Sequence, residues 1–373
     1  MEDRALKPHT PDRGLQIAQA RRAVLGDEVV AGPPHVEGWI ERSWRRCLAR
    51  GYRPDQSIGF NAVSRAAVDQ AIEASHSLLQ AASPVIASLS RTMADTGYFA
   101  ILTDARGVVI GVDGPVDHSN RLAHLIARVG VDLSETAVGT TAIGTTLAEL
   151  HPVWLHRGEH FFEDTSAYSC AGAPLFGPDG RCVGMLDLTG VHVAERPALK
   201  HLVTQSAQRI ENAMLLAQPH RLRLRINWPG QILGSDGDGL VCLDSDGCIT
   251  GANRHAALML GLQGGAPWPH SSDVFALAHE ELFDAARSDR PAAELPLWSG
   301  LRVQVQVRHN DGLPYTLAPR PQSTPAVPLK DLEDALIRKA VLDAKGNVME
   351  AARRLGISRA TVYRKLQRRK PGT

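Results

Sequence analysis

Hydrophobic and polar positions divide the first part of the chain into helical and extended segments. Apolar residues recur at helical spacing over residues 15–57, 68–94 and 197–218. Between the second and third of these stretches the pattern changes to short apolar runs, which lie at 98–102, 108–112, 167–176 and 182–188. Each pair of runs brackets a polar, glycine-containing turn and so predicts a hairpin. This order of helices and hairpins predicts an α+β unit with an antiparallel sheet.

A second, smaller α+β unit is predicted over residues 234–317. Two apolar runs, 240–243 and 248–251, flank a turn, and a helical pattern follows at 252–262. Apolar and polar residues alternate strictly from 301 to 308, which is typical of a strand with one buried face.

The segment from Gly346 to Leu366 carries a helix-turn-helix pattern. Small and apolar residues allow two short helices to cross, Gly356 can adopt the positive φ of a tight turn, and Ser358 can cap the second helix. A further helix is predicted over 329–343. The predicted core of this unit consists of Ala351, Ala352, Leu355, Ile357, Val362 and Leu366.

Charge separates this C-terminal segment from the rest of the chain. Residues 330–373 hold 12 Lys and Arg against 5 Asp and Glu, a net of +7, whereas residues 1–329 hold 29 against 35, a net of −6. An acidic body repels DNA and leaves contact to the basic helices.

The C-terminal segment closely resembles the Fis-type helix-turn-helix of bacterial regulators, from Leu336 to Arg368. The resemblance implies binding to double-stranded DNA, with Arg359 and Arg364 on base edges, and a homodimer built through the preceding helix. At the position of Tyr363 the family usually has a basic or polar residue, so this sequence departs from the family pattern there. The candidate DNA-binding residues are Ser358, Arg359, Thr361, Tyr363, Arg364, Lys365 and Arg368.

Residues 135–161 and 170–190 look like the GAF domain of the sigma-54-dependent regulators of acetoin and glycerol metabolism. Ser43, Trp44, Arg46 and Cys47 fit the leader of the same group. The resemblance implies a small-molecule effector and control of transcription. Taken alone, the arginine-rich stretch 38–51 is open to interpretation as a second nucleic-acid contact. We favour an amphipathic helix packed on the sensor, because its apolar residues have helical spacing.

A cluster of aromatic and polar residues marks a candidate ligand pocket in this sensor. Such a mixture suits a concave apolar site with a few orienting polar groups, although each residue also fits an ordinary core position. The candidate ligand-binding residues are Trp154, His160, Phe161, Tyr168 and Cys170.

The smaller unit resembles a PAS-type domain, with Asn253 at the hairpin-to-helix position, and we expect it to be structural or dimerising. Neither a cofactor nor a metal site is predicted, because no residue set suits haem, flavin or a metal. The expected organisation is an N-terminal helical segment (1–66), a GAF sensor domain (67–220), a PAS-like domain (225–317), a proline-rich linker (318–328) and an all-α helix-turn-helix domain (329–373).

The related regulators carry an ATPase domain between sensor and helix-turn-helix, but this sequence contains no G-x-x-x-x-G-K-[ST] motif. We therefore expect regulation without ATP hydrolysis. Direct contact with RNA polymerase, promoter blocking and competition with a full-length relative remain open. No apolar run of membrane-span length and no signal region is present, which predicts a cytoplasmic protein without a membrane partner.

Two other classes of function are open at this point. Cys170 follows His160 by ten residues, which suggests a cysteine-dependent GAF enzyme, but no set of cysteine, base and acid is evident and no catalytic residue is predicted. A nucleoid-type structural DNA binder would bind without regard to sequence or metabolite.

Overall fold

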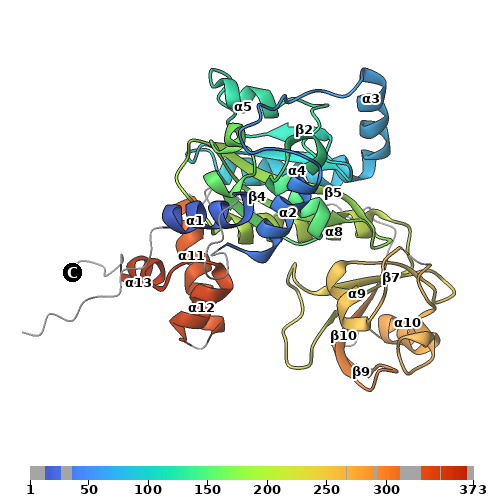
Figure 1. The fold of residues 1–373 in the computed structure, drawn as a ribbon. Coiled ribbons are helices and arrows are strands. Elements are labelled where there is room, and N and C mark those ends of the chain that lie inside the picture. The colour runs from blue at the N-terminus through green and yellow to red at the C-terminus, as the bar shows by residue number, and fades with distance from the viewer. Residues whose placement is uncertain are drawn as a thin grey trace, which may run out of the picture.

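The computed structural model describes residues 13–26, 36–265, 267–288, 292–310, 329–344 and 346–367. They form two five-stranded antiparallel sheets with their helices, followed by a unit of three helices (Figure 1). The α+β architecture with a helical C-terminal region agrees with the sequence-based prediction. Within the described residues, no helix is long and apolar enough to cross a membrane.

The first sheet has the strand order β2-β1-β5-β4-β3. The two predicted hairpins are confirmed as β1–β2 and β4–β5, whereas the four-residue β3 was missed because it is too short to show alternation. The strands are β1 (Tyr98–Asp104), β2 (Val109–Asp113), β3 (Val153–His156), β4 (Tyr168–Phe176) and β5 (Cys182–Val191).

Each face of this sheet carries its own hydrophobic core, because successive side chains of a strand point to opposite faces. One face packs against α4 (His76–Thr92) and α8 (Leu199–Ala217), and α3 (Arg65–Ala74) precedes α4. The other face is covered by elements from two distant parts of the chain, as Figure 1 shows. These are α1 (Arg13–Leu25), α2 (Gly38–Ala49), α5 (Arg121–Ile126), α6 (Glu135–Val138) and α7 (Ala142–Glu149).

The second sheet has the order β8-β7-β6-β10-β9. Its strands are β6 (Leu222–Asn227), β7 (Gly239–Leu243), β8 (Ile249–Ala252), β9 (Ala293–Pro296) and β10 (Arg302–His309), with α9 (Arg254–Leu260) and α10 (His279–Arg287). The strand β6, in which buried and half-buried residues alternate, was not predicted. Because β6 begins at Leu222, this sheet starts before residue 225, where the second α+β domain was expected to begin. In the described part of the chain, short 3-10 helices lie at Arg157–Glu159, Glu163–Thr165 and Ser271–Asp273.

The end of α8 connects the two sheets. Leu215 and Leu216 pack against Leu240 and Cys242 of β7. Asn253 stabilises the same junction: its Oδ1 accepts from Ala256 N at 2.9 Å and caps α9, and its Nδ2 donates to Asn212 of α8 at 2.8 Å. The hairpin-to-helix position of Asn253 therefore has a structural role.

The C-terminal unit consists of α11 (Leu329–Asp343), α12 (Val348–Leu355) and α13 (Arg359–Gln367). The predicted turn and cap are confirmed, since Gly356 has φ +65° and Ser358 Oγ accepts from Thr361 N at 3.1 Å. Ile337, Ala352 and Val362 form the buried centre of the unit. The predicted linker at 318–328 and the candidate Arg368 lie outside the described residues.

Candidate functional site

Helix α2 lies against the sensor sheet with its apolar side buried, as expected for an amphipathic helix. Trp39, Ile40, Trp44 and Cys47 belong to the core of that face. The indole Nε1 of Trp44 donates to the carbonyl of Glu159 at 2.9 Å. Because a buried indole N–H needs an acceptor, this bond orients the helix on the sheet.

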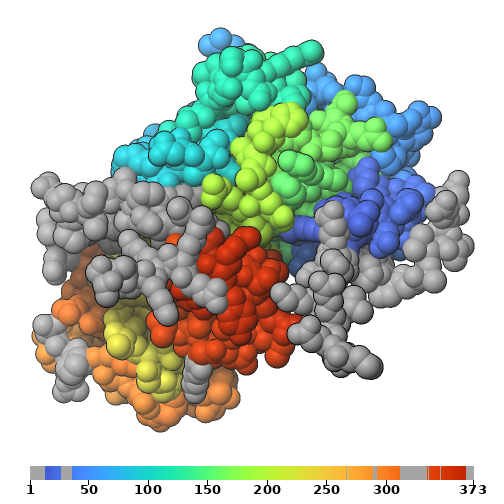
Figure 2. All heavy atoms as spheres, turned by 90° about the vertical axis from the view of Figure 1, so that its left-hand side faces the viewer, coloured from blue at the N-terminus to red at the C-terminus, as the bar shows by residue number. Residues whose placement is uncertain are grey.

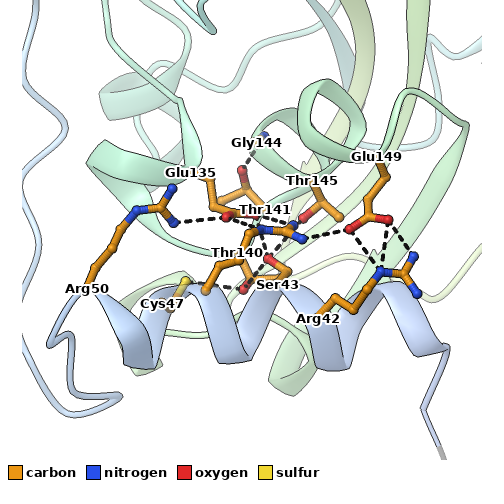
Figure 3. A network of polar contacts seen from close by, with 11 residues as sticks. Arg42, Ser43, Cys47, Arg50, Glu135, Thr140, Thr141, Gly144, Thr145 and Glu149 are labelled. Carbon is orange, nitrogen blue, oxygen red and sulfur yellow. Dashed lines mark hydrogen bonds and ion pairs between the residues drawn. The ribbon is translucent and has the colours of Figure 1, made fainter.

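The polar side of α2 is held by the carboxylate of Glu135, which is nearly buried at the start of α6 (Figure 3). It accepts from Ser43 Oγ at 2.8 Å, from Arg46 Nε and Nη2 at 2.7 Å each and from Arg50 Nη1 at 3.0 Å. Burial alone would raise the pKa of Glu135, but the bonds from Arg46 and Ser43 hold it below its ordinary value.

A second carboxylate, Glu149 at the end of α7, binds Arg46 at 2.7 Å and also pairs with Arg42. Arg45 pairs with Glu41 of its own helix at 2.6 Å. All four arginines of this stretch thus face carboxylates of the sensor or of α2 itself. The ion pairs favour the interpretation of α2 as a helix docked on the sensor. They disfavour the alternative that the sequence left open, in which residues 38–51 contact nucleic acid.

Beneath α2, the core of the sheet contains a row of buried polar side chains. His160 Nε2 lies 3.8 Å from Cys170 Sγ, and Thr189 Oγ1 contacts both Cys170 Sγ, at 3.3 Å, and the carboxyl group of Asp187. The other oxygen of Asp187, Oδ1, has no hydrogen-bond partner among the described residues. Buried polar atoms are normally paired, so this one is a candidate contact for a ligand.

Burial keeps this row uncharged or weakly charged. It lowers the pKa of His160 to about 4 and raises the pKa of Asp187 to about 7. His160 Nδ1 donates to the carbonyl of Arg157 at 2.8 Å, so its neutral Nε2 is an acceptor facing the thiol. Burial also raises the pKa of the Cys170 thiol, which is the opposite of what a nucleophilic cysteine requires.

Four of the five candidate ligand-binding residues lie on this face: His160, Phe161, Tyr168 and Cys170. The rings of His160 and Tyr168 are 6.5 Å apart. Trp154 belongs to the opposite core, because alternation along β3 turns it away and stacks it on His156. Trp154 therefore does not share a pocket with the other four.

The polar residues that matter most here were not selected from the sequence. Asp187 lies within the predicted apolar run 182–188, and a charged residue inside such a run is the signal that identifies it, whereas Thr189 directly follows the run. Glu135 offered no comparable signal, because its importance depends on arginines about 90 residues away.

The helix-turn-helix presents its basic residues unevenly. Arg359, Tyr363 and Arg364 are exposed on α13, while Val362 is fully buried. Thr361 is half-buried, and its hydroxyl is 2.9 Å from that of Ser358. This is the arrangement expected of a recognition helix, with one side in the small core and the other free for the major groove.

Lys365 differs from the other candidates on this helix. Its ammonium lies 3.3 Å from the carboxylate of Asp334 on α11, and its side chain is only 11% exposed. The ion pair ties the recognition helix to the preceding helix, so Lys365 faces the unit's interior rather than its free surface.

Comparison with protein families gives two matches. Residues 17–212 match the family described as MimR, N-terminal domain, and residues 328–368 match the bacterial regulatory protein, Fis family. The first match includes α2 and the whole first sheet, and the second covers the three C-terminal helices.

Several characterised regulators are similar to this chain. An acetoin catabolism regulatory protein of Cupriavidus necator is 30% identical over 275 residues, which cover 72% of this chain and 40% of the relative. The acetoin dehydrogenase operon transcriptional activator AcoR of Bacillus subtilis is 27% identical over 47% of this chain and 29% of its own length. The chain thus spans well under half the length of these relatives. The matches confirm the resemblance to acetoin-type regulators with a Fis-type helix-turn-helix.

Among solved structures, the Escherichia coli DhaR(N)–DhaL complex matches with a TM-score of 0.46 and 15% identity. The match covers 74% of this chain and 100% of the other.

Proposed function

Because the chain belongs to the family of the MimR N-terminal domain and also carries a Fis-family DNA-binding region, we propose that it is a ligand-responsive regulator of transcription. In this proposal a small metabolite binds the first sheet unit and changes how the C-terminal helices engage promoter DNA. The Cupriavidus necator and Bacillus subtilis relatives are named as transcriptional regulators.

The observation that carries the DNA-binding part is the geometry of α13. It exposes Arg359 and Arg364 while Val362 holds the helix in its core. Guanidinium groups form bidentate hydrogen bonds with guanine edges, so these two side chains are the proposed base readers. Paired α11 helices would place two copies of α13 on a two-fold site.

The ligand-binding part rests on the unpaired Asp187 Oδ1, which lies in the core beside the buried polar side chains of His160 and Thr189. We assign the first sheet unit to the GAF class and the second to the PAS class, and we place the effector on the α2 side, against His160, Tyr168 and Cys170. Acetoin stands in the names of two relatives and is therefore the first compound to test.

Ligand binding would act through α2, which closes this face of the sheet. Arg46 of this helix pairs with Glu135 at the start of α6 and with Glu149 at the end of α7 (Figure 3). A bound ligand that shifts α7 would therefore alter both ion pairs together. The regulator then works as a two-state equilibrium that ligand and DNA both bias. ATP hydrolysis has no part in this mechanism.

Footprinting of genomic binding sites tests the proposal. We expect discrete two-fold sites upstream of a set of genes and a change in occupancy when acetoin or the substrates of those genes are added. Binding spread along DNA without sequence preference would support the nucleoid-type alternative and contradict the regulatory proposal.

Thiol titration of the native protein tests the enzyme alternative. We expect Cys170 to resist alkylation until the protein is denatured, because its thiol is buried and its pKa is raised. Rapid alkylation that also abolishes effector binding would reopen cysteine chemistry.

A further inference from the structure

A cavity of about 450 Å³ lies beside α1 and α2, where the sensor meets the C-terminal unit. Arg13 and Ile17 of α1, Trp39 of α2 and Lys200 of α8 contribute to its wall. Figure 1 shows α1 beside the C-terminal helices, and Figure 2 shows those helices packed against the sensor. The volume falls in the range typical of small-molecule sites.

The cations that line this cavity are not equivalent. Arg13 pairs with Glu159 at 2.7 Å and also with Glu195. Lys200 forms no ion pair with any described residue, although it is half-buried. Burial lowers the pKa of Lys200, and the more exposed Glu37 at the rim only partly offsets this effect. An ammonium left without a carboxylate in such a place is a ready partner for an anion.

The remainder of the lining mixes polar and apolar side chains. Its polar members are Gln16, Glu37 and Glu159, and the carboxylate of Glu159 is already paired with Arg13. Trp39 and Trp154 contribute indole rings, joined by Ile17 and Pro197. The Nε1 of Trp154 is buried without a hydrogen-bond partner in the described part of the chain. Trp154, which alternation along β3 turned away from the other candidate residues, therefore has a cavity of its own.

We propose that this cavity binds a small monocarboxylate with an apolar body, whose carboxylate pairs with Lys200 and whose body lies against Trp39 and Trp154. The cavity lies at the edge of the sheet, where Trp39 of one core and Trp154 of the other both reach it. It is distinct from the proposed effector site, because none of His160, Tyr168 and Cys170 lines it. It does not depend on the identity of that effector.

The position of the cavity gives this site a role in communication. Leu355, the last residue of α12, and Gly356, which begins the turn to α13, complete its wall. A bound carboxylate contacts the sensor and the DNA-binding unit at the same time, so it stabilises the docked arrangement of the two.

Calorimetry on the full chain tests the proposal with acetate, isovalerate, benzoate and phenylacetate, each compared with its neutral amide. We expect at least one acid with an apolar body to bind, with at least ten-fold preference over its amide and with quenching of tryptophan fluorescence. Lys200→Met should weaken that acid at least ten-fold, since one ion pair in a half-buried site is worth about a factor of ten.

Lys339→Met is the matched control. Lys339 is exposed on α11, close enough to lower the pKa of the neighbouring His201, but it does not line the cavity. This variant should bind the acid as the unmodified chain does. The proposal is overturned if none of the four acids binds, if acid and amide bind equally, or if Lys200→Met and Lys339→Met have the same effect. Retained binding of the α2-side effector in Lys200→Met shows that the two sites are separate.

Discussion

Two arginine-rich helices of this protein, α2 and α13, have similar composition and different surroundings. On α2, Arg42, Arg46 and Arg50 reach carboxylates of α6 and α7, and the helix is docked on the sensor. On α13, Arg359 and Arg364 are exposed and form no ion pair with the described residues. The arginine content of a helix therefore does not by itself indicate a nucleic-acid contact, because the carboxylates that the fold brings to the helix decide whether its guanidinium groups are paired.

The largest effect is expected from Glu135→Gln, which removes the carboxylate that holds α2. Ser43, Arg46 and Arg50 would share a single amide oxygen in place of two carboxylate oxygens, and two partly buried guanidinium groups would lose the negative charge of Glu135. We expect the free energy of unfolding of the sensor to fall by about 3 kcal/mol, measured by urea denaturation. A loss no larger than that of Glu41→Gln, whose carboxylate pairs with the exposed Arg45 of the same helix, would mean that the network does not hold the helix.

The same network predicts a loss of stability in acid. The folded pKa of Glu135 lies below its ordinary value of 4.5, so its contribution is present above that pH and is lost as the pH falls through the folded pKa. Urea denaturation between pH 6 and 3 should therefore show a steeper decline for the unmodified chain than for Glu135→Gln. If the stability of the two proteins fell in parallel with pH, the lowered pKa of Glu135 would be contradicted.

The second effect concerns DNA recognition by α13. Arg359→Ala and Arg364→Ala should each cost about 1 to 3 kcal/mol of binding free energy and relax the preference at one base position, with little change in stability. Affinity for variant operators, measured at one salt concentration, checks this. If each substitution weakened every sequence equally, the two arginines would be phosphate contacts instead.

A smaller effect separates Lys365 from its neighbours on the same helix. Since its ammonium pairs with Asp334, Lys365→Ala should lower the stability of the C-terminal unit by about 1 kcal/mol. The salt dependence of DNA binding should stay nearly the same. A salt slope reduced by about one with unchanged stability would identify Lys365 as a phosphate contact.

The smallest effect is expected from Arg45→Ala on α2, because this arginine is exposed and, among the described residues, forms an ion pair only with Glu41 one turn away. A change below about 0.5 kcal/mol in stability is typical of such pairs. Operator affinity should not change. A clear loss of affinity would mean that α2 contributes to the DNA-binding surface after all.

Much of the fold could be predicted from local patterns. The hairpins β1–β2 and β4–β5 and the helix-turn-helix follow from hydrophobic periodicity and turn residues at fixed positions. The short β3 and the partners of β6 could not be derived in this way, because pairing in the second sheet joins β6 to β10, about 80 residues later.

The candidate ligand site was predicted in part. His160, Phe161, Tyr168 and Cys170 come together on one side of the sheet as the local cluster suggested, whereas Trp154 lies on the other. Asp187 was missed, since a single carboxyl group within a strand gains its meaning only from the core around it.

The sequence by itself determined the hairpins β1–β2 and β4–β5, the basic C-terminal unit and the capped turn of the helix-turn-helix, because these depend on residues within a few positions of one another. Tertiary structure decided which arginines are neutralised, which face of the sheet each aromatic residue joins and which cations remain unpaired. Those outcomes depend on distances between residues far apart in the chain, and both electrostatic energy and desolvation change steeply with distance and burial.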